Sequence, residues 1–325
     1  MPNVNHIGVL TSGGDAPGMN AATRATVRTA VANGVRVTGI IRGFTGLVGG
    51  DFEQLQARSV SNIIQLGGTM LKTSRCEGFY EPSGRTQAAA RMADAGIDAL
   101  VAIGGDGTFR GLRDLYEEHG IRSIGVPGTI DNDIYGTDFT IGFDTAVNTA
   151  LESIDKIRDT AASHDRIFFI EVMGRSCGAI ALEVGVSGGA EGVLVPEVTL
   201  DMDALCAAIS RGKEQGKTSY IIVVAEGAHE GGAQAVCDIV TERVSLEGRV
   251  SVLGHVQRGG SPSSSDRALA SRMGRAAVEA LLDGEFDAMI GMSCGEMVLV
   301  PLSEATGKKK DVDLDLLKLA EITAT

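Results

Sequence analysis

The sequence predicts an α/β fold in which mostly parallel strands alternate with helices. One observation is a βαβ pattern: the apolar run Ile7–Leu10, the helix-compatible segment Ala21–Ala32 and a second apolar run, Val35–Ile41. Another is the composition, because 44 glycines with only 7 prolines and no tryptophan indicate many tight turns between regular elements. A disordered or collagen-like chain would not show this combination.

Length and charge limit the possible classes of function. A chain of 325 residues, 43% of them hydrophobic, predicts one large or two ordinary domains. The formal net charge of −13 disfavours nonspecific binding to nucleic acid or to an anionic membrane, so local arginines must attract any anionic substrate. No apolar run approaches the roughly 20 residues of a membrane helix, and no basic, apolar leader opens the chain.

The five cysteines form no CxxC pair and are odd in number. A disulfide framework or a zinc site is therefore not expected. Together with the composition, this pattern predicts a soluble protein of the reducing cytoplasm.

The stretch Gly104–Thr108 is the main candidate for a phosphate-binding loop. It follows the apolar run Ile97–Ile103, which reads as a buried strand, and precedes the helix-like segment Phe109–Glu118. Glycines let backbone N–H groups approach an anion closely, and the helix N-terminus adds partial positive charge. Asp106 would then stand where Mg²⁺ is held beside bound phosphates, although a structural turn with a capping aspartate would read the same way.

Two further loops follow strand candidates in the same way. Thr11–Asn20 follows the first strand, and Pro127–Asp133 follows the strand candidate Ser123–Val126. Because parallel strands end at one edge of a sheet, we expect the three loops to converge there, where ligands bind in such folds.

The second half of the chain continues the alternation. A helix at Thr145–Ala161 leads to a strand at Arg166–Val172, which ends in Met173–Gly178. The remaining predictions are a helix and short strand within Ala179–Pro196, a capped helix at Asp201–Glu214, strands at Ser219–Ala225 and Arg249–Leu253, and a long helix at Asp266–Leu282. The run Lys308–Lys310 is expected on a solvated surface, and no repeat or low-complexity linker marks a domain boundary.

Three known motifs are only partly matched. Gly216–Thr218 resembles the end of a P-loop, but Arg211 stands where that motif needs glycine. The glycines of Gly105–Gly107 fail the dinucleotide fingerprint, whose third glycine would fall at Arg110. Asp131–Asp133 begins like a calcium loop, but the later ligand positions do not match. The roles that remain open for Asp131 and Asp133 are catalysis and the stabilisation of a turn.

The chemistry that these loops could support is phosphoryl transfer. It needs backbone amides around the phosphates, a metal, cations at the transferring group and a base for the attacking hydroxyl. The glycine loops and Asp106 supply the first two, Arg75 and Arg175 could face the transferring group, and Asp131 could be the base. Further basic residues near strand ends could bind a second phosphate: Arg166, Arg249, His255 and Arg258. Each alone would more often be a surface ion pair or a structural histidine.

Taken together, these motifs resemble the bacterial-type 6-phosphofructokinases from Gly8 to about Pro301. The segments that carry the resemblance are Gly8–Asn20, Ile103–Thr108, Pro127–Asp133, Glu171–Arg175 and Val252–Pro262. The resemblance implies transfer of the γ-phosphoryl group of ATP to the 1-hydroxyl of fructose 6-phosphate, a glycolytic reaction. It also implies two doubly wound, Rossmann-like domains with the active site in the cleft between them.

The resemblance assigns roles to individual residues. Asp131 would be the base, supported by Asp133, while Thr129 and Arg175 would stabilise the transferring phosphoryl group. Asp106 would be the Mg²⁺ residue. The phosphate donor would be bound by Gly14, Arg75, Cys76, Gly105, Asp106, Gly107 and Thr108.

The resemblance also implies an acceptor site shared between subunits of a homotetramer, a dimer of dimers. Arg166 and Arg249 would reach across from a neighbouring subunit. The other residues implied for fructose 6-phosphate are Thr129, Ile130, Asp131, Met173, Gly174, Arg175, Glu226, His255 and Arg258. The ATP-binding domain would comprise residues 1–141 and 256–306, and the fructose 6-phosphate-binding domain residues 142–255 and 307–325.

Two glycines indicate which phosphoryl donor the protein uses. Pyrophosphate-using relatives place an aspartate at the position of Gly107 and a lysine at that of Gly128, and a bulky charged side chain at the first would occupy the space of the α-phosphate of ATP. ATP is therefore expected. The segment Gly142–Ala146 looks closer to the branch that contains pyrophosphate users, so pyrophosphate stays the alternative.

Two rival functions lack the same support. Lipid and NAD kinases share the Gly-Gly-Asp-Gly core but lack segments like Thr129–Asp133 and His255–Arg258. A noncatalytic sugar-phosphate sensor would be expected to lack the base or the metal residue, and this chain has both Asp131 and Asp106.

The match weakens at the effector site of regulated relatives, which binds ADP or phosphoenolpyruvate. Five residues fit that site: Arg24, Arg28, Arg158, Glu191 and Lys217. Five positions depart from it: Ala57, Asn62, Gln215, Thr218 and Ser219. Because most of these changes remove a cation or a histidine, we expect weak or absent regulation of this type.

Overall fold

The structure is a computed structural model that describes residues 4–324, and it forms two compact units. Unit 1 comprises the chain up to Ile130 together with Ile134–Asp144 and Arg258–Lys310. Unit 2 comprises Asp131–Asp133, Thr145–Gln257 and the chain from Asp311 onward. Each unit holds its own sheet, and the fold is α/β as the sequence predicts. The assignment of ATP and fructose 6-phosphate to separate domains, with the boundaries given above, stays a prediction.

Unit 1 is built on a seven-stranded sheet in the order β11-β10-β5-β4-β1-β2-β3. Five adjacent strands are parallel, and the two edge strands, β3 and β11, run antiparallel to their neighbours. The strands are β1 (His6–Thr11), β2 (Arg36–Ile40), β3 (Phe52–Leu55), β4 (Ala99–Gly104), β5 (Arg122–Pro127), β10 (Ala288–Ser293) and β11 (Glu296–Pro301).

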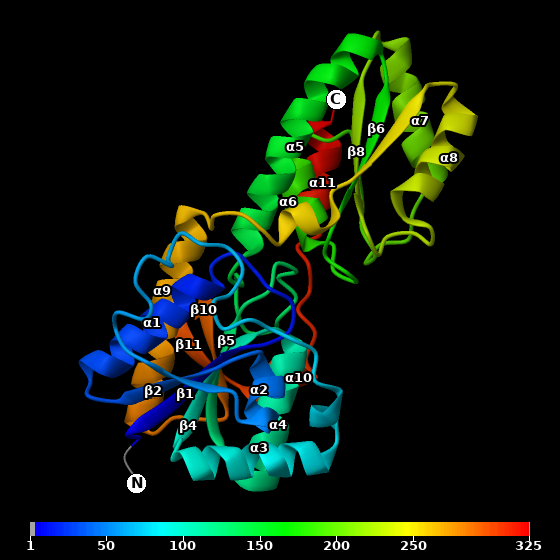
Figure 1. The fold of residues 1–325 in the computed structure, drawn as a ribbon. Coiled ribbons are helices and arrows are strands. Elements are labelled where there is room, and N and C mark those ends of the chain that lie inside the picture. The colour runs from blue at the N-terminus through cyan, green and yellow to red at the C-terminus, as the bar shows by residue number, and fades with distance from the viewer. Residues whose placement is uncertain (1–3, 325) are drawn as a thin grey trace. The chain divides into compact units, whose positions relative to one another are not determined.

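Helices cover both faces of this sheet, as Figure 1 shows, with α1 and α9 on one face and α2, α3, α4 and α10 on the other. Strands β1 and β4 are buried at every residue, which explains their continuous apolar sequence. The helices are α1 (Met19–Ala32), α2 (Gly43–Gly49), α3 (Pro82–Ala95), α4 (Asp106–His119), α9 (Ser264–Asp283) and α10 (Leu302–Gly307), with a 3₁₀ turn η1 (Glu77–Tyr80).

Unit 2 is built on a four-stranded parallel sheet in the order β7-β8-β6-β9. In Figure 1, helices α7 and α8 lie on one face and α5, α6 and α11 on the other. The strands are β6 (Ile167–Val172), β7 (Gly192–Leu194), β8 (Tyr220–Ala225) and β9 (Gly248–Val252). The helices are α5 (Phe143–His164), which begins in unit 1, α6 (Ala179–Ser187), α7 (Met202–Glu214), α8 (Gly232–Val244) and α11 (Asp315–Thr323), with a 3₁₀ turn η2 (Gly254–Gln257).

The predicted strands and helices are present, with ends that shift by a few residues. The predicted cap of α7 is confirmed, because the Asp201 carboxylate accepts a hydrogen bond of 2.8 Å from the backbone N–H of Ala204. Helix α4 begins at Asp106, three residues earlier than predicted, so Asp106, Gly107 and Thr108 form its first turn.

Other elements were not assigned from sequence. They include the hairpin of β10 and β11 at one edge of the sheet and strand β3, which pairs with the predicted β2, at the other. No helix within residues 4–324 is both long and apolar enough to span a membrane.

Candidate active site

Three glycine-containing loops meet at one edge of the sheet of unit 1. They follow β1, β4 and β5, which are adjacent and parallel. The N–H of Ser12 donates to the carbonyl of Ile103 at 3.0 Å, and that of Gly128 to the carbonyl of Gly104 at 2.9 Å. The predicted convergence of the three loops is therefore confirmed.

The loop after β4 is packed so closely that Gly104 cannot carry a side chain. A Cβ at Gly104 would lie 2.3 Å from Oγ1 of Thr108 and 2.5 Å from the carbonyl oxygen of Ser12. The Thr108 hydroxyl is buried and has no hydrogen-bond partner within residues 4–324. A buried hydroxyl without a hydrogen-bond partner lowers the stability of the folded protein. An oxygen-rich ligand that bound this hydroxyl would therefore stabilise the loop.

Asp106 is the first residue of α4, and its side chain is 39% exposed. Its carboxylate pairs with Arg110, one turn later, at 2.9 Å. Among residues 4–324 no three acidic, histidine or cysteine side chains gather as a metal cage. Mg²⁺ shared with phosphates needs only one or two carboxylates, so Asp106 fits that use. At Gly107 a Cβ would have no atom within 4 Å, so the first turn of α4 is open there.

The loop after β1 is held by neighbouring side chains. The Thr73 hydroxyl donates to the carbonyl of Gly13 at 2.7 Å. The guanidinium of Arg258 lies against Gly14, 2.6 Å from where a Cβ would be, and donates to the carbonyl of Asp15 at 3.2 Å. Arg258, expected at the sugar phosphate, thus belongs to unit 1 and contacts the glycine loop. Two residues implied for the donor, Arg75 and Cys76, directly precede η1.

Unit 2 contains the predicted base beside a cation. Asp131 is only 2% exposed, and its Oδ2 lies 3.5 Å from Nε of Arg175. The Arg175 side chain is largely exposed, at 62%. A buried carboxylate paired with an accessible arginine can accept a proton while the arginine faces an incoming anion.

The loop Met173–Arg175, which follows β6, has a defined conformation. Gly174 and Arg175 both have positive φ, 140° and 54°, which is uncommon for an arginine. A single oxygen of Glu226 accepts from the N–H groups of Gly174 at 3.3 Å and Arg175 at 2.6 Å. The N–H of Met173 donates to Oε1 of Gln257 at 2.6 Å. Two side chains therefore bind three consecutive N–H groups of this loop.

Cys177 lies in the same region, and its thiol is buried. Burial raises the pKa of its thiol to about 11, and the nearby carboxylates of Glu197, Asp133 and Asp131 add to the effect. The thiol stays protonated at neutral pH.

The two arginines expected to reach a neighbouring subunit lie together. Arg166 pairs with Glu247 at 2.8 Å, and Arg249 pairs with the other oxygen of the same carboxylate. The hydrogen bond from Arg166 is the main reason that the pKa of Glu247 is lowered. His255, in η2, is exposed. Their predicted roles toward the sugar phosphate remain predictions.

The residues that fit the effector site divide between the units. In unit 2, Glu191 is 3.0 Å from Lys217 and 3.7 Å from Arg158, so one carboxylate pairs with both cations. The Lys217 ammonium also donates to the carbonyl of Ala324 at 2.9 Å. Arg24 and Arg28 lie on α1 of unit 1.

Sequence reasoning missed Gln257 and Thr73, which contact the site loops without being in a predicted role. Gln257 is 0% exposed although it is polar, and its only sequence signal is its place between His255 and Arg258.

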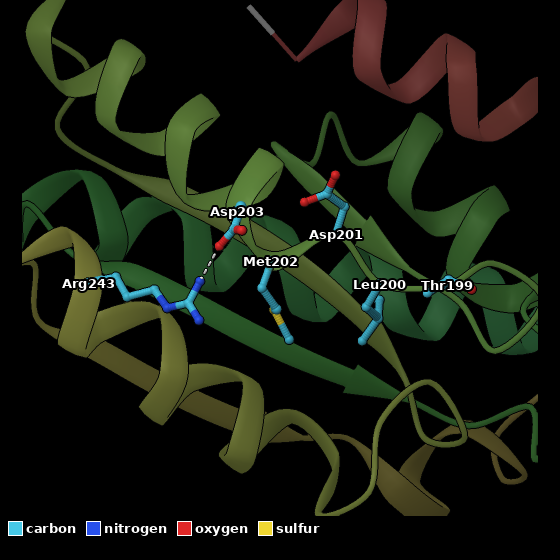
Figure 2. Close-up of a pocket in the computed structure, with 6 residues that line it drawn as sticks. All are labelled: Thr199, Leu200, Asp201, Met202, Asp203 and Arg243. Carbon is cyan, nitrogen blue, oxygen red and sulfur yellow. Dashed lines mark hydrogen bonds and ion pairs between the residues drawn. The ribbon is translucent and has the colours of Figure 1, made fainter.

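A pocket of about 560 Å³ lies elsewhere in unit 2 (Figure 2), lined by Thr199, Leu200, Asp201, Met202, Asp203 and Arg243. None of the predicted site residues lines it.

Comparison with known proteins agrees with these features. A relative from Thermus thermophilus, named ATP-dependent 6-phosphofructokinase 1, is 57% identical over 321 residues, covering 99% of this chain and 100% of its own. A relative from Bacteroides thetaiotaomicron, named ATP-dependent 6-phosphofructokinase 2, is 51% identical over 320 residues, covering 98% of both.

Solved structures and family assignment point the same way. The structure of phosphofructokinase from Saccharomyces cerevisiae superposes with a TM-score of 0.88 at 36% identity over 98% of this chain. This chain spans about half of the yeast chain, 48%. Residues 6–281 match the family described as Phosphofructokinase. The chain therefore belongs to the phosphofructokinase family.

Proposed function

We propose that this chain is an ATP-dependent 6-phosphofructokinase, which transfers the γ-phosphoryl group of ATP to the 1-hydroxyl of fructose 6-phosphate. The products are fructose 1,6-bisphosphate and ADP. The observation that carries the proposal is the buried carboxylate of Asp131 beside the accessible guanidinium of Arg175. Relatives of nearly equal length that are named ATP-dependent 6-phosphofructokinase support it.

Asp131 is the proton acceptor in this proposal. When the sugar hydroxyl attacks the γ-phosphorus, its proton passes to the carboxylate of Asp131. A positioned base of this kind contributes roughly 10² to 10⁴ to the rate. Arg175 offsets charge on the transferring oxygens, with Thr129, and Asp133 supports the base.

The phosphate donor is assigned to the loops of unit 1. Backbone N–H groups around Gly14 and Gly105–Thr108 bind the phosphates, and α4 adds the positive end of its dipole. The Thr108 hydroxyl is assigned to the donor as well, because it is buried and has no hydrogen-bond partner within residues 4–324. Asp106 would hold Mg²⁺, which when bound neutralises charge on the phosphates.

The acceptor is assigned to Met173–Arg175, Glu226 and His255, with Arg258 and the neighbouring-subunit arginines Arg166 and Arg249. A homotetramer built as a dimer of dimers and a cytoplasmic location are part of the same proposal. The open first turn of α4 at Gly107 leaves room for a nucleotide, which supports ATP over pyrophosphate.

The test is an end-point phosphorus NMR spectrum of the purified protein with Mg²⁺ and fructose 6-phosphate, run with ATP and, separately, with pyrophosphate. Fructose 1,6-bisphosphate from ATP alone is expected. Product from pyrophosphate would show that Gly107 and Gly128 do not set the donor. Product from neither would reject the proposal and favour a sugar-phosphate sensor.

A further inference from the structure

Gln257 is a fully buried polar side chain that joins three segments of unit 2. Its Oε1 accepts from the N–H of Met173 at 2.6 Å, and its Nε2 donates to the carbonyl of Ala146 at 3.3 Å. Gln257 itself closes η2, the turn that carries His255. The glutamine therefore ties the loop after β6 and the start of α5 to η2.

The chemistry at this position admits few side chains. One protein group to be satisfied is a donor, the N–H of Met173, and the other is an acceptor, the carbonyl of Ala146. A primary amide offers an acceptor and a donor at once, which fixes its orientation. Leucine, of similar size, would leave both backbone groups buried without these partners.

The loop that Gln257 holds is the one proposed to bind the sugar phosphate. Its Gly174 and Arg175 have positive φ, and Glu226 fixes their N–H groups. Gln257 fixes the residue before them, at the point where the chain leaves β6. Without it the loop would keep the anchor of Glu226 but lose the one at Met173.

We propose that Gln257 is a positioning residue for fructose 6-phosphate. It acts through Met173 and through η2, and it sets how well the loop and His255 are preorganised for the acceptor. This inference rests on the proposed function, since it concerns the acceptor of that reaction. Gln257 does not touch the reacting atoms, so it should affect acceptor binding more than the chemical step.

The first variant is Q257L. We expect KM for fructose 6-phosphate to rise by roughly tenfold, because the buried N–H of Met173 loses its partner, with KM for ATP unchanged and kcat less affected. Gln234 provides the control, since it is an exposed glutamine of unit 2 whose side chain donates to Asp238 one turn away. Q234L should match the wild type. An unchanged KM for fructose 6-phosphate in Q257L would overturn the proposal.

The second variant, Q257E, distinguishes positioning from general destabilisation and serves if Q257L does not fold. Burial favours the neutral acid, whose carbonyl can accept from Met173 and whose O–H can donate to Ala146. The ionised form cannot donate. The ratio of KM for fructose 6-phosphate in Q257E to that in the wild type should therefore fall toward one between pH 8.5 and pH 6. A ratio independent of pH would contradict the inference.

Hydrogen exchange separates this inference from the proposed function. The N–H of Met173 should exchange at least tenfold faster in Q257L, while Q234L leaves it unchanged, and this readout needs no activity. An inactive wild type with this exchange pattern would reject the proposed function and keep Gln257 as the anchor of the loop. An active wild type with unchanged exchange in Q257L would reject the anchor alone.

Discussion

Unit 1, to which the donor is assigned, and unit 2, to which most of the acceptor contacts are assigned, hold their loops in different ways. Unit 1 uses backbone: glycine loops at the ends of β1, β4 and β5, with Gly104 pressed against Thr108 and Ser12. Unit 2 uses side chains: Glu226 and Gln257 bind consecutive N–H groups, and Asp131 pairs with Arg175. We therefore expect substitutions that add bulk to disturb unit 1 most. Substitutions that alter charge or hydrogen bonding should disturb unit 2 most.

The largest effect is expected at Asp131. Asp131→Ala should lower kcat by roughly 10² to 10⁴ because the base is removed, while ATP binding stays almost intact. Steady-state kinetics and nucleotide titration measure the two. Asp131→Asn, which keeps the shape but not the basicity, should be similarly impaired. Near-normal kcat in either variant would remove Asp131 from the base role.

The next largest effect is expected from a charged side chain at Gly107, the glycine that is predicted to favour ATP as the donor. Gly107→Asp should raise KM for ATP by about tenfold or more, a change of about 1.4 kcal/mol, because a carboxylate would repel phosphates at this turn. Stability should be retained, since the position is open and helix N-termini accept acidic residues. Gly107→Ala is the matched control, which adds bulk without charge. A Gly107→Asp enzyme with wild-type KM for ATP would contradict the role of this glycine.

The steric character of unit 1 is tested by paired alanine variants. Gly104→Ala should lower the free energy of unfolding by roughly 1–3 kcal/mol, because its Cβ would overlap Thr108 and Ser12. Gly107→Ala, three residues later, should be neutral or slightly stabilising, since alanine favours a helix. Urea unfolding of both variants measures the contrast. Equal losses would show that contacts at this turn are not the deciding factor.

A smaller effect of pH is expected from His6 on β1 of unit 1. Its ring bonds to the carbonyl of Gly96 and the hydroxyl of Thr38, each at 2.8 Å, and burial lowers the pKa of His6 below its usual value of about 6.5. The unfolded chain then binds the proton more readily, so the free energy of unfolding should fall as pH drops below about 6.5.

The measurement is urea unfolding of the wild type and of His6→Gln at pH 7.5 and pH 5.5. The part of the pH dependence that belongs to His6 should be missing from the variant. Identical pH dependence in both proteins would show that His6 contributes none of it.

The smallest effect is expected from effectors. Glu191 already pairs with Lys217 and Arg158, and several cations of regulated relatives are absent from this chain. ADP or phosphoenolpyruvate should therefore change the activity at low fructose 6-phosphate only slightly. A large sigmoidal response would show that the remaining basic residues suffice.

Much of the fold followed from local patterns. Buried parallel strands such as β1 and β4 are continuous apolar runs, and glycine loops at their ends are visible in the sequence. The hairpin of β10 and β11 was not predicted although its pairing is local, since only Cys294 and Gly295 separate the paired residues Ser293 and Glu296.

The sequence by itself determined the α/β class, the three glycine loops and the residue types that phosphoryl transfer needs. Only the tertiary structure decided that Gln257 anchors Met173, that Arg258 lies on the Gly14 loop and that Glu191 pairs with Lys217. Loops at adjacent strand ends follow from local periodicity. Hydrogen bonds between residues dozens of positions apart follow only from the way that the chain packs.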